Sequence, residues 1–555
     1  MESPRIKRVL ISVTDKTGVV SFAHVLTQEF GAEVISTGGT ARALEEAGIA
    51  VRRIDDLTGF PEMMDGRVKT LHPRVHGGLL ARRDVLAHME AAAKHGIDMI
   101  DMVVVNLYAF EATVARKDVS FEEAIENIDI GGPSMLRSAA KNHQAVAVVT
   151  NPSSYEEILG EMRAHDGATT LNTRRRLALE VFRLTSAYDN AIYSWFARQV
   201  SDENAFPDEC RLFLTKQSDL RYGENPHQRA AFYRRAQDSG AAQGAASGQG
   251  TASPQDGTTP AQDGIVSGQG PHPEYQLANA GQIQGKELSY NNYLDLDAAW
   301  GAVREFEAPT CVIVKHLTPC GIASNNSLVD AYQRAHEVDP VSAFGGVMAF
   351  NRPVPAALVK AIYANGQFVE AVIAPAYEDA ALTLFEEKEN LRVLKTGGIN
   401  VFGDSVDYRS VEGGMLVMTT DTVSEDPATF TVPTKREPTP EELESLLFAW
   451  RACKSVKSNA IVIAKDNATV GSGAGQPNRV NSARIAVSQA GEKARGAVAA
   501  SDAFMPFADS LEVLIDAGVT AVIQPGGSIR DEEVIAAADA AGLALVFTGH
   551  RHFRH

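Results

Sequence analysis

A lysine and a histidine stand side by side in CVIVKHLTPCGIA, residues 311–323. The apolar run before Lys315 and His316 predicts a buried strand that ends in two polar side chains, and we expect Pro319 and Gly321 to turn the chain just after it. A cation beside an imidazole tends to lower the imidazole pKa, so we expect His316 to be neutral and able to accept a proton near pH 7. The alternative is a capped strand with two solvated side chains.

A second group of residues suits an anion. The segment STGGTARAL, residues 36–44, follows a strand-like run. Gly38 and Gly39 permit positive φ and close backbone approach, and Thr40 can cap the following helix, so that amide groups and the helix dipole converge on a phosphate. The alternative is an ordinary strand-to-helix turn. The sequence has no G-x-x-x-x-G-K-[ST], which argues against a P-loop NTPase.

The segment 58–83 is rich in glycine, proline, histidine and cations. His72 and His76 have the i, i+4 spacing of a metal pair, but Pro73 lies between them and is expected to break the helix that such a pair needs. We therefore expect no zinc there. A polar loop of this length favours a ligand-gripping role over a solvated connection.

Two further segments carry polar groups near strand or helix ends. Tyr108 closes the strand-like run 100–108, at the end where open α/β sheets bind ligands, although a half-buried core ring is the alternative. The segment 127–143 presents Asp129, two glycines, an expected helix start at Pro133–Ser134, and Lys141.

The carboxy-terminal half has three more candidate segments. LRYGENPHQRAAFY, residues 220–233, predicts a polar turn able to hold a planar hydrogen-bonding ligand. The glycines at 471, 473 and 475 have the wrong spacing for a dinucleotide fingerprint and predict a mobile glycine loop. Phe504 and Phe507 in SDAFMPF predict either an apolar wall for an aromatic cofactor or ordinary core packing.

The elements that must position these residues alternate between strands and helices. Strand-like runs at 7–13, 32–37, 100–108 and 145–150, with helices near 18–30 and 40–47, predict a parallel α/β sheet, and residues 173–200 predict a long amphipathic helix that closes the unit. Strand-like runs recur at 311–316, 371–375, 414–420, 460–464, 521–526 and 543–549. Residues 237–273 offer almost nothing to bury and predict a disordered surface insertion.

The composition narrows the class of protein. The 555 residues carry 52 Lys plus Arg against 70 Asp plus Glu, a net charge of −18, which is the wrong sign for a nonspecific nucleic-acid binder. No run approaches the ~20 apolar residues of a membrane span, and no signal peptide is evident, so we expect a cytoplasmic protein. The four cysteines never form C-x-x-C, which argues against disulfides and against a thiolate zinc site.

Together these segments resemble the bifunctional purine biosynthesis family that joins AICAR transformylase to IMP cyclohydrolase. The motifs GRVKTLHPRVHGG, IDIGGPSMLRSAAKNH, RYGENPHQ, VKHLTPCG and SDAFMPF stand in the family's order from Arg5 to His555, interrupted only by the insertion. The resemblance implies an α/β protein with a methylglyoxal-synthase-like parallel-sheet domain at 1–200. It implies two cytidine-deaminase-like α/β subdomains at 201–425 and 426–555. Zinc deaminases use P-C-x-x-C, and Cys320 has no such partner cysteine, so zinc deamination is not expected.

The resemblance implies two reactions. The first is formyl transfer from the cosubstrate 10-formyltetrahydrofolate to AICAR, with His316 as the base, Lys315 stabilising the oxyanion or protonating the departing nitrogen, and Asn459 orienting the formyl group. The second is dehydrative ring closure of formyl-AICAR to IMP. The residues implied to bind substrate or line the transformylase site are Arg221, Tyr222, His227, Asp339, Gly475, Asp502 and Arg551.

For ring closure, the family's catalytic positions fall on Lys69, Tyr108, Asp129 and Lys141, and the proton donor stays open. The residues implied to hold the 5′-phosphate are Thr14, Lys16, Thr37, Gly38, Gly39, Thr40, Arg67 and Thr70. The resemblance implies no metal or nicotinamide in either step, although related transformylases can carry a structural potassium ion. It implies a homodimer with transformylase sites at the interface, and no nucleic-acid or membrane partner.

Two other hypotheses stay open. One half could be active while the other has lost its activity, or the protein could be a nucleotide-sensing regulator, since methylglyoxal-synthase-like domains also bind effectors without chemistry. The polar positions that match the family are filled at both sites, which argues against both alternatives.

Overall fold

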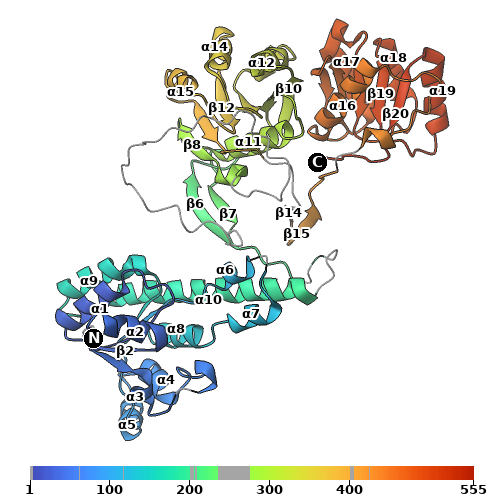
Figure 1. Ribbon diagram of the computed structural model, residues 1–555. Coiled ribbons are helices and arrows are strands. Elements are labelled where there is room, and N and C mark those ends of the chain that lie inside the picture. Colours follow the sequence, from blue (N-terminus) through green and yellow to red (C-terminus); the bar gives the residue numbers. More distant parts are fainter. Residues whose placement is uncertain are drawn as a thin grey trace. The chain divides into compact units, whose positions relative to one another are not determined.

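The structure, a computed structural model, describes residues 4–61, 63–116, 118–200, 206, 209–235, 275–399, 406–423 and 426–555 (Figure 1). The chain divides into two compact units, Met1–Thr215 with Arg235–Pro254, and Lys216–Arg234 with Gln255–His555. The predicted insertion 237–273 lies outside the described residues. Within the described ranges, every helix is too short or too polar to cross a bilayer.

The first unit is built on a five-stranded sheet in which all pairings are parallel. The strands, in spatial order, are β3 (Val51–Arg53), β2 (Glu33–Ser36), β1 (Arg8–Ser12), β4 (Met102–Val105) and β5 (Ala147–Val149). All four residues of β4 are buried, as expected of a β-branched run that is covered on both faces. The predicted parallel α/β sheet is confirmed.

Ten helices accompany this sheet in the described part of the first unit. They are α1 (Val19–Gln28), α2 (Gly38–Glu46), α3 (Ile54–Thr58), α4 (Pro73–Leu80), α5 (Leu86–Lys94), α6 (Phe110–Val114), α7 (Phe121–Glu126), α8 (Gly131–Lys141), α9 (Tyr155–Ala164) and α10 (Leu171–Val200). The long helix predicted at 173–200 is therefore confirmed as α10. Its Leu177 and Val181 are fully buried in the core of the sheet unit.

The segment 58–83 differs from the expected long loop because α4 occupies its second half. Pro73 is the first residue of α4, a position where the missing N–H of proline is harmless. The Nδ1 atom of His72 accepts a hydrogen bond from the backbone N–H of Arg74 at 3.1 Å and so caps the helix. His72 itself has extended backbone and lies outside α4, so no helix carries both His72 and His76, and the expectation that Pro73 interrupts such a helix is confirmed.

The second unit contains an eleven-stranded mixed sheet. Its strands, in spatial order, are β20 (Ala544–Phe547), β19 (Ala521–Gln524), β18 (Val498–Ser501), β16 (Ile461–Lys465), β17 (Ala468–Gly473), β10 (Thr318–Ser324), β9 (Thr310–Lys315), β11 (Gly346–Phe350), β12 (Val369–Ala374), β13 (Arg392–Lys395) and β8 (Gly281–Gln284). Two hairpins stand apart from it, β6 (Leu214–Leu220) with β7 (Ala230–Arg235), and β14 (Val406–Val411) with β15 (Gly414–Thr419).

The large sheet is made of two halves with the same order of elements. In the first half, α11 (Tyr290–Val303) precedes the β9–β10 hairpin and α12 (Leu328–His336), and β11, β12 and β13 follow with α13 (Pro340–Ala343), α14 (Ala356–Ala364) and α15 (Asp379–Phe385). In the second half, α16 (Pro440–Lys454) precedes the β16–β17 hairpin and α17 (Arg479–Ala490), and β18, β19 and β20 follow with α18 (Asp509–Asp516) and α19 (Asp531–Ala541).

The two halves meet in the middle of the sheet. Strands β10 and β17 pair antiparallel there, at Ala323 and Ala468. Trp300 of α11 and Trp450 of α16 are both buried, and each precedes the lysine that ends the next strand by the same number of residues. In Figure 1 the first half is drawn in green to yellow and the second half in orange to red. The expected mixed α/β architecture after the parallel-sheet domain is confirmed.

The glycines predicted to form a mobile loop lie mostly within strand β17. A Cβ atom on Gly471 would lie 2.1 Å from the carbonyl oxygen of Ala486, and one on Gly473 would lie 1.9 Å from that of Ser482. Both residues therefore allow α17 to pack directly on the strand backbone. The prediction of a mobile loop was wrong for these two positions, because the missing side chains serve close packing rather than flexibility.

Candidate functional site

The pair Lys315–His316 lies at the tip of the β9–β10 hairpin. Lys315 ends β9 and pairs with Thr318, so His316 and Leu317 are the two central residues of the turn. Their φ angles are 52° and 63°, as in a type I′ turn. Large side chains rarely adopt positive φ, and each such residue costs about 1–3 kcal/mol. The turn therefore holds these two residues in a strained conformation.

The expected turn residues have other roles. Pro319 and Gly321 lie inside β10, and the pairing register with β9 shifts between them. A Cβ atom on Gly321 would lie 1.9 Å from the carbonyl oxygen of Ala335 in α12, so this glycine permits close helix packing. The expectation that they turn the chain was wrong, since the hairpin turns two residues earlier.

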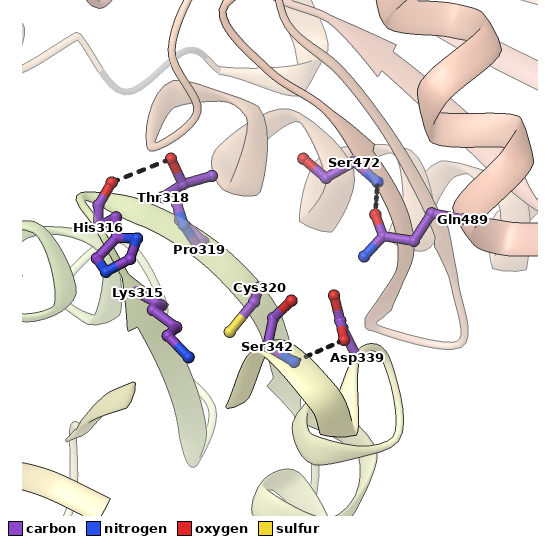
Figure 2. Close-up of a pocket in the computed structure, with 9 residues that line it drawn as sticks. All are labelled: Lys315, His316, Thr318, Pro319, Cys320, Asp339, Ser342, Ser472 and Gln489. Atoms are coloured by element: carbon purple, nitrogen blue, oxygen red, sulfur yellow. Dashed lines mark hydrogen bonds between the residues drawn. The ribbon is translucent and has the colours of Figure 1, made fainter. Parts of the chain in front are cut away.

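A cavity of about 230 Å³ opens beside the hairpin (Figure 2). It is lined by Lys315, His316, Thr318, Pro319, Cys320, Asp339, Ser342, Ser472 and Gln489. The Nζ atom of Lys315 donates a hydrogen bond to the carbonyl oxygen of Phe344 at 2.6 Å, which fixes the ammonium group. The structure thus brings Lys315, His316 and Asp339, three of the residues selected from the sequence, to one cavity.

The other walls of the cavity come from both halves of the sheet. Asp339 caps α13 by accepting a hydrogen bond from the backbone N–H of Ser342 at 2.8 Å. From the second half, the backbone N–H of Ser472 donates to Oε1 of Gln489 at 2.8 Å (Figure 2). The Ser472 hydroxyl oxygen is buried and has no hydrogen-bond partner within the described residues. The sequence analysis missed Ser472 and Gln489, and only the glycines that flank Ser472 mark that strand as unusual.

The thiol of Cys320 also faces this cavity. Burial raises the pKa of Cys320 to about 12, and the nearby Asp339 carboxylate acts in the same direction. The thiol therefore keeps its proton at neutral pH, and it donates to the carbonyl oxygen of Ile313 at 3.4 Å. A protonated thiol is neither a nucleophile nor a zinc ligand.

Asn459 belongs to a buried polar network rather than to the lining of this cavity. Its Nδ2 donates to the carbonyl oxygen of Gln476 at 2.8 Å, and its Oδ1 accepts from Nη2 of Arg479 at 2.7 Å. The Arg479 side chain is 6% exposed and forms an ion pair with Asp502, which is fully buried. The second carboxylate oxygen of Asp502 accepts from the hydroxyl of Ser458. Asp502 therefore orients Arg479, and Arg479 orients Asn459.

The network around Asn459 includes a residue that the sequence analysis missed and one that it predicted. Arg479 was missed, although an arginine at the start of a helix rich in small residues is a usable signal. Gly475 lies just beyond β17 with a φ of 66°, and its backbone N–H donates to the carbonyl oxygen of Lys457 at 2.8 Å. Asp502 and Gly475 thus shape the surroundings of Asn459.

Four predicted nucleotide-binding residues do not line the cavity. Arg221, Tyr222 and His227 lie between β6 and β7, and the Arg221 guanidinium carbon lies 5.5 Å from the centre of the Tyr222 ring. Arg551 is exposed, and its guanidinium carbon lies 4.4 Å from the centre of the Phe553 ring. Their substrate contacts stay predictions.

The two rings of the SDAFMPF segment lie at the surface. Phe504 is 39% exposed and Phe507 is 45% exposed, whereas Met505 between them is fully buried. The alternative expectation, that these two rings pack in the core, is therefore wrong. The apolar wall stays a prediction.

In the first unit, the expected phosphate site lies at the start of α2. The helix begins at Gly38, whose φ is 43°, and Thr37 is its N-cap residue. The Thr40 hydroxyl oxygen accepts from the backbone N–H of Val13 at 3.0 Å and donates to the carbonyl oxygen of Val13 at 2.9 Å. The expectation that Thr40 caps the helix was wrong, because it lies in the first turn and ties that turn to the chain after β1. Positive φ is confirmed at Gly38, and Gly39 does not adopt it.

Lys69 and Thr70 face the starts of two helices. A Cβ atom on Gly38 would lie 3.2 Å from Nζ of Lys69, and one on Gly131 would lie 2.5 Å from the hydroxyl oxygen of Thr70. The two glycines thus leave room for these polar groups at the N-termini of α2 and α8. Positive charge and free amide groups at such ends favour an anion.

Asp129 lies at the start of α8. Its Oδ1 accepts from the backbone N–H of Gly132 at 2.8 Å, and burial raises its pKa although three backbone hydrogen bonds act against the rise. Burial and the Asp129 charge raise the pKa of Tyr108, whose ring is 47% exposed. The phenol of Tyr108 therefore keeps its proton at neutral pH and can donate it.

Two supporting residues of this site were missed. Tyr188 of α10 accepts a hydrogen bond from the backbone N–H of Asp129 at 2.7 Å, and burial raises the pKa of Tyr188 to about 12. Asn106 accepts from the backbone N–H of Thr14 at 2.6 Å, which holds the segment that carries Lys16. Asn106 stands two residues before Tyr108, just after β4, which is the signal that could have found it.

Arg67 and Lys141 were also predicted for the ring-closure site. Arg67 is exposed and forms an ion pair with Glu126. Lys141 is the exposed last residue of α8. At 1.5 Å per residue, it lies about 15 Å along the helix from Gly131. The structure therefore brings Lys69, Thr70, Tyr108 and Asp129 to the starts of α2 and α8 and leaves Lys141 at the opposite end of α8.

Comparison with known proteins identifies the family. The family model described as AICARFT/IMPCHase bienzyme matches residues 139–253 and 254–489. The chain belongs to the AICARFT/IMPCHase bienzyme family. The model for the MGS-like domain matches residues 18–134, which carry three of the five strands of the parallel sheet. Membership of the AICARFT/IMPCHase bienzyme family makes the protein a bifunctional enzyme of purine biosynthesis and confirms the resemblance seen in the sequence.

A solved structure also matches part of this AICARFT/IMPCHase family member. The structure titled "Crystal structure of ForH" is 36% identical, covers 34% of this chain and 99% of its own, and has a TM-score of 0.32.

Proposed function

We propose that this enzyme transfers the formyl group of 10-formyltetrahydrofolate to AICAR and then closes the ring of formyl-AICAR to give IMP. The observation that carries the proposal is the hairpin tip, where Lys315 and His316 share one cavity with Asp339. The match to the bienzyme family supports both activities in general terms. The assignment of each reaction to particular residues is our inference from the family resemblance together with the geometry.

Formyl transfer needs a base because the amino group of AICAR is a weak nucleophile. Its lone pair is delocalised into an electron-poor imidazole, so its proton must leave as the new C–N bond forms. His316 takes this proton, while the Lys315 ammonium group stabilises the oxyanion on the formyl carbon. The bond from the formyl carbon to the folate nitrogen then breaks, and the departing nitrogen receives a proton, which releases tetrahydrofolate.

Asn459 orients the formyl group in this proposal. Its amide is fixed on both sides, by Gln476 and by Arg479, so its orientation is set before a substrate binds. A fixed dipole contributes to catalysis because it does not reorganise during the reaction. The contacts of AICAR with Arg221, Tyr222 and His227 are part of the same proposal.

Ring closure takes place in the first unit. The carboxamide nitrogen of formyl-AICAR attacks the formyl carbon, and water is lost. Tyr108, which keeps its proton at neutral pH, protonates the leaving oxygen, and the neighbouring Asp129 carboxylate accepts the proton that the attacking nitrogen loses. The starts of α2 and α8, with Lys69 and Thr70, hold the 5′-phosphate and stabilise the developing negative charge.

We further propose a cytoplasmic homodimer with no resident metal in either reaction. The described residues contain no group of three or more histidine, cysteine, aspartate or glutamate side chains around one point. We assign no ligand set for a potassium ion, and no step above is routed through one. The mechanism uses only groups of this chain and its two substrates.

The test is the variant His316→Ala. Loss of a general base typically slows a reaction about 10²–10⁴-fold, so formyl transfer should fall by this factor while the ring closure of supplied formyl-AICAR stays at the wild-type rate. Asp466→Asn is the matched control, because Asp466 occupies the same turn position in the second half of the sheet. Equal loss of both activities in a folded His316→Ala protein would contradict the assignment.

A further inference from the structure

A carboxylate outside the cavity holds the strained hairpin tip. Asp295 lies on α11, and its Oδ1 accepts a hydrogen bond from the backbone N–H of Leu317 at 2.7 Å. Burial raises the pKa of this carboxyl, while the backbone N–H groups of Leu317 and His316 and the nearby His316 side chain act against the rise. Both central residues of the turn are thus held by one side chain that comes from a different element.

The equivalent turn in the second half of the sheet has no such need for a carboxylate from another element. This turn consists of Asp466 and Asn467, with φ angles of 50° and 58°. Asp and Asn tolerate positive φ, and His adopts it more often than most residues, whereas Leu rarely does. Glu444 of α16 accepts a hydrogen bond from the side chain of Asn467, at 2.6 Å from Nδ2 to Oε1. One turn is stabilised by its own residue types, and the other is held from outside.

We propose that Asp295 is a positioning residue for formyl transfer. Its carboxylate keeps His316 and Leu317 at positive φ and so keeps the imidazole in the cavity that Lys315 and Asp339 line. The proposal rests on the proposed role of His316. Asp295 touches neither substrate in this proposal. It acts through the backbone of the turn, and its charge also interacts with the His316 side chain, an effect that Asp295→Asn separates from the hydrogen bond.

The consequence of losing this acceptor follows from the geometry. Without Asp295, the backbone N–H of Leu317 loses its partner, and the two residues are free to leave the positive-φ region. A displacement of a catalytic group by about 1 Å can slow a reaction about 10²-fold. Substrate binding depends on other residues, so we expect the loss to appear in kcat rather than in KM.

The experiment compares Asp295→Ala with Asp295→Asn in the full-length protein, with AICAR and 10-formyltetrahydrofolate as substrates. For Asp295→Ala we expect kcat to fall about 10–100-fold, with KM for AICAR within about threefold of wild type. Asp295→Asn keeps an oxygen at the same place to accept from Leu317, so its kcat should stay within about threefold of wild type. The ring closure of supplied formyl-AICAR should not change in either variant.

Two controls keep the test decisive. Glu444→Ala removes the acid that bonds the second turn and should leave kcat within about twofold, because Asp466 and Asn467 favour their conformation without it. If Asp295→Ala does not fold, Asp295→Leu keeps the volume without the acceptor and should show the same fall in kcat.

Three outcomes would overturn the proposal: unchanged kcat in folded Asp295→Ala or Asp295→Leu, an equal fall in Asp295→Asn, or a fall in Glu444→Ala as large as in Asp295→Ala. These outcomes differ from a failure of the proposed role of His316, which would appear as formyl transfer at the wild-type rate in His316→Ala.

Discussion

Removal of one charge from the Arg479–Asp502 pair should both destabilise the second unit and slow formyl transfer. Asp502→Asn keeps the shape of the side chain and removes the negative charge. Arg479, which is 6% exposed, would then be a buried cation without a counterion. Its hydrogen bond to Oδ1 of Asn459 depends on the same placement, so the amide of Asn459 should lose its fixed orientation.

The size of the effect follows from the burial of both partners. Breaking a buried ion pair by removing one partner costs about 3–5 kcal/mol, because the remaining charge has lost both its partner and its hydration. By comparison, Arg530 and Glu533 are about half exposed and lie 3.6 Å apart. Loss of such a surface pair changes stability by about 0–1 kcal/mol, so Glu533→Gln is the matched control.

Urea unfolding followed by tryptophan fluorescence measures this loss. Trp300 and Trp450 are buried in the second unit, while Trp195 belongs to the first. A Trp195→Phe background therefore makes the signal specific to the second unit. Asp502→Asn should lower the free energy of unfolding by about 3 kcal/mol or more in this background. A loss below about 1 kcal/mol, similar to that of Glu533→Gln, would refute the view that this pair is a buried, unscreened contact.

Three further predictions follow from single residues. Gly473→Ala forces a Cβ atom to 1.9 Å from the Ser482 carbonyl oxygen and should destabilise the second unit by about 1–3 kcal/mol in the same assay. Gly160→Ala, which meets no atom within 4 Å in α9, should stabilise the first unit by up to about 1 kcal/mol, measured in the chain that keeps Trp195, the tryptophan of that unit. Tyr108→Phe should make formyl-AICAR accumulate in a chromatographic assay without slowing its formation, and wild-type conversion of the intermediate would exclude the phenol from the mechanism. Burial raises the pKa of Asp129 above its usual 3.8, so the stability that this carboxyl contributes is complete below about pH 3.8 and is lost as the pH rises through the raised pKa. Asp129→Asn removes that loss, so the melting temperature of the variant should increase relative to that of the wild type as the pH rises from about 4 to about 7. A difference in melting temperature that stays constant over this pH range would contradict the raised pKa of Asp129.

The sequence was sufficient for features that arise from local pattern. Buried β-branched runs predicted the strands of the parallel sheet, and apolar spacing predicted α10. The neighbours Lys315 and His316 were found because both residues stand at the end of such a run. These signals lie within a few residues of the chain, where hydrophobic periodicity is informative.

The contacts that the sequence did not reveal join distant segments. Asp295 of helix α11 bonds to Leu317 in the β9–β10 turn, and Arg479 of α17 bonds to Asn459, which lies on the other side of the β16–β17 hairpin in the sequence. The residue types alone do not indicate which partners these side chains contact. Glycine and proline were misinterpreted for a related reason, since Gly471 serves helix packing and Pro319 lies inside strand β10, and both roles depend on what lies next to the backbone.

The central claim is that one chain carries out both reactions, and the most direct test supplies purified protein with AICAR and 10-formyltetrahydrofolate and measures tetrahydrofolate, formyl-AICAR and IMP over time. The account predicts that IMP appears in equal amount to the tetrahydrofolate released, with little formyl-AICAR present. Accumulation of formyl-AICAR without IMP would contradict the ring-closure site at α2 and α8. Release of no tetrahydrofolate at all would contradict the enzyme and favour a nucleotide-sensing protein.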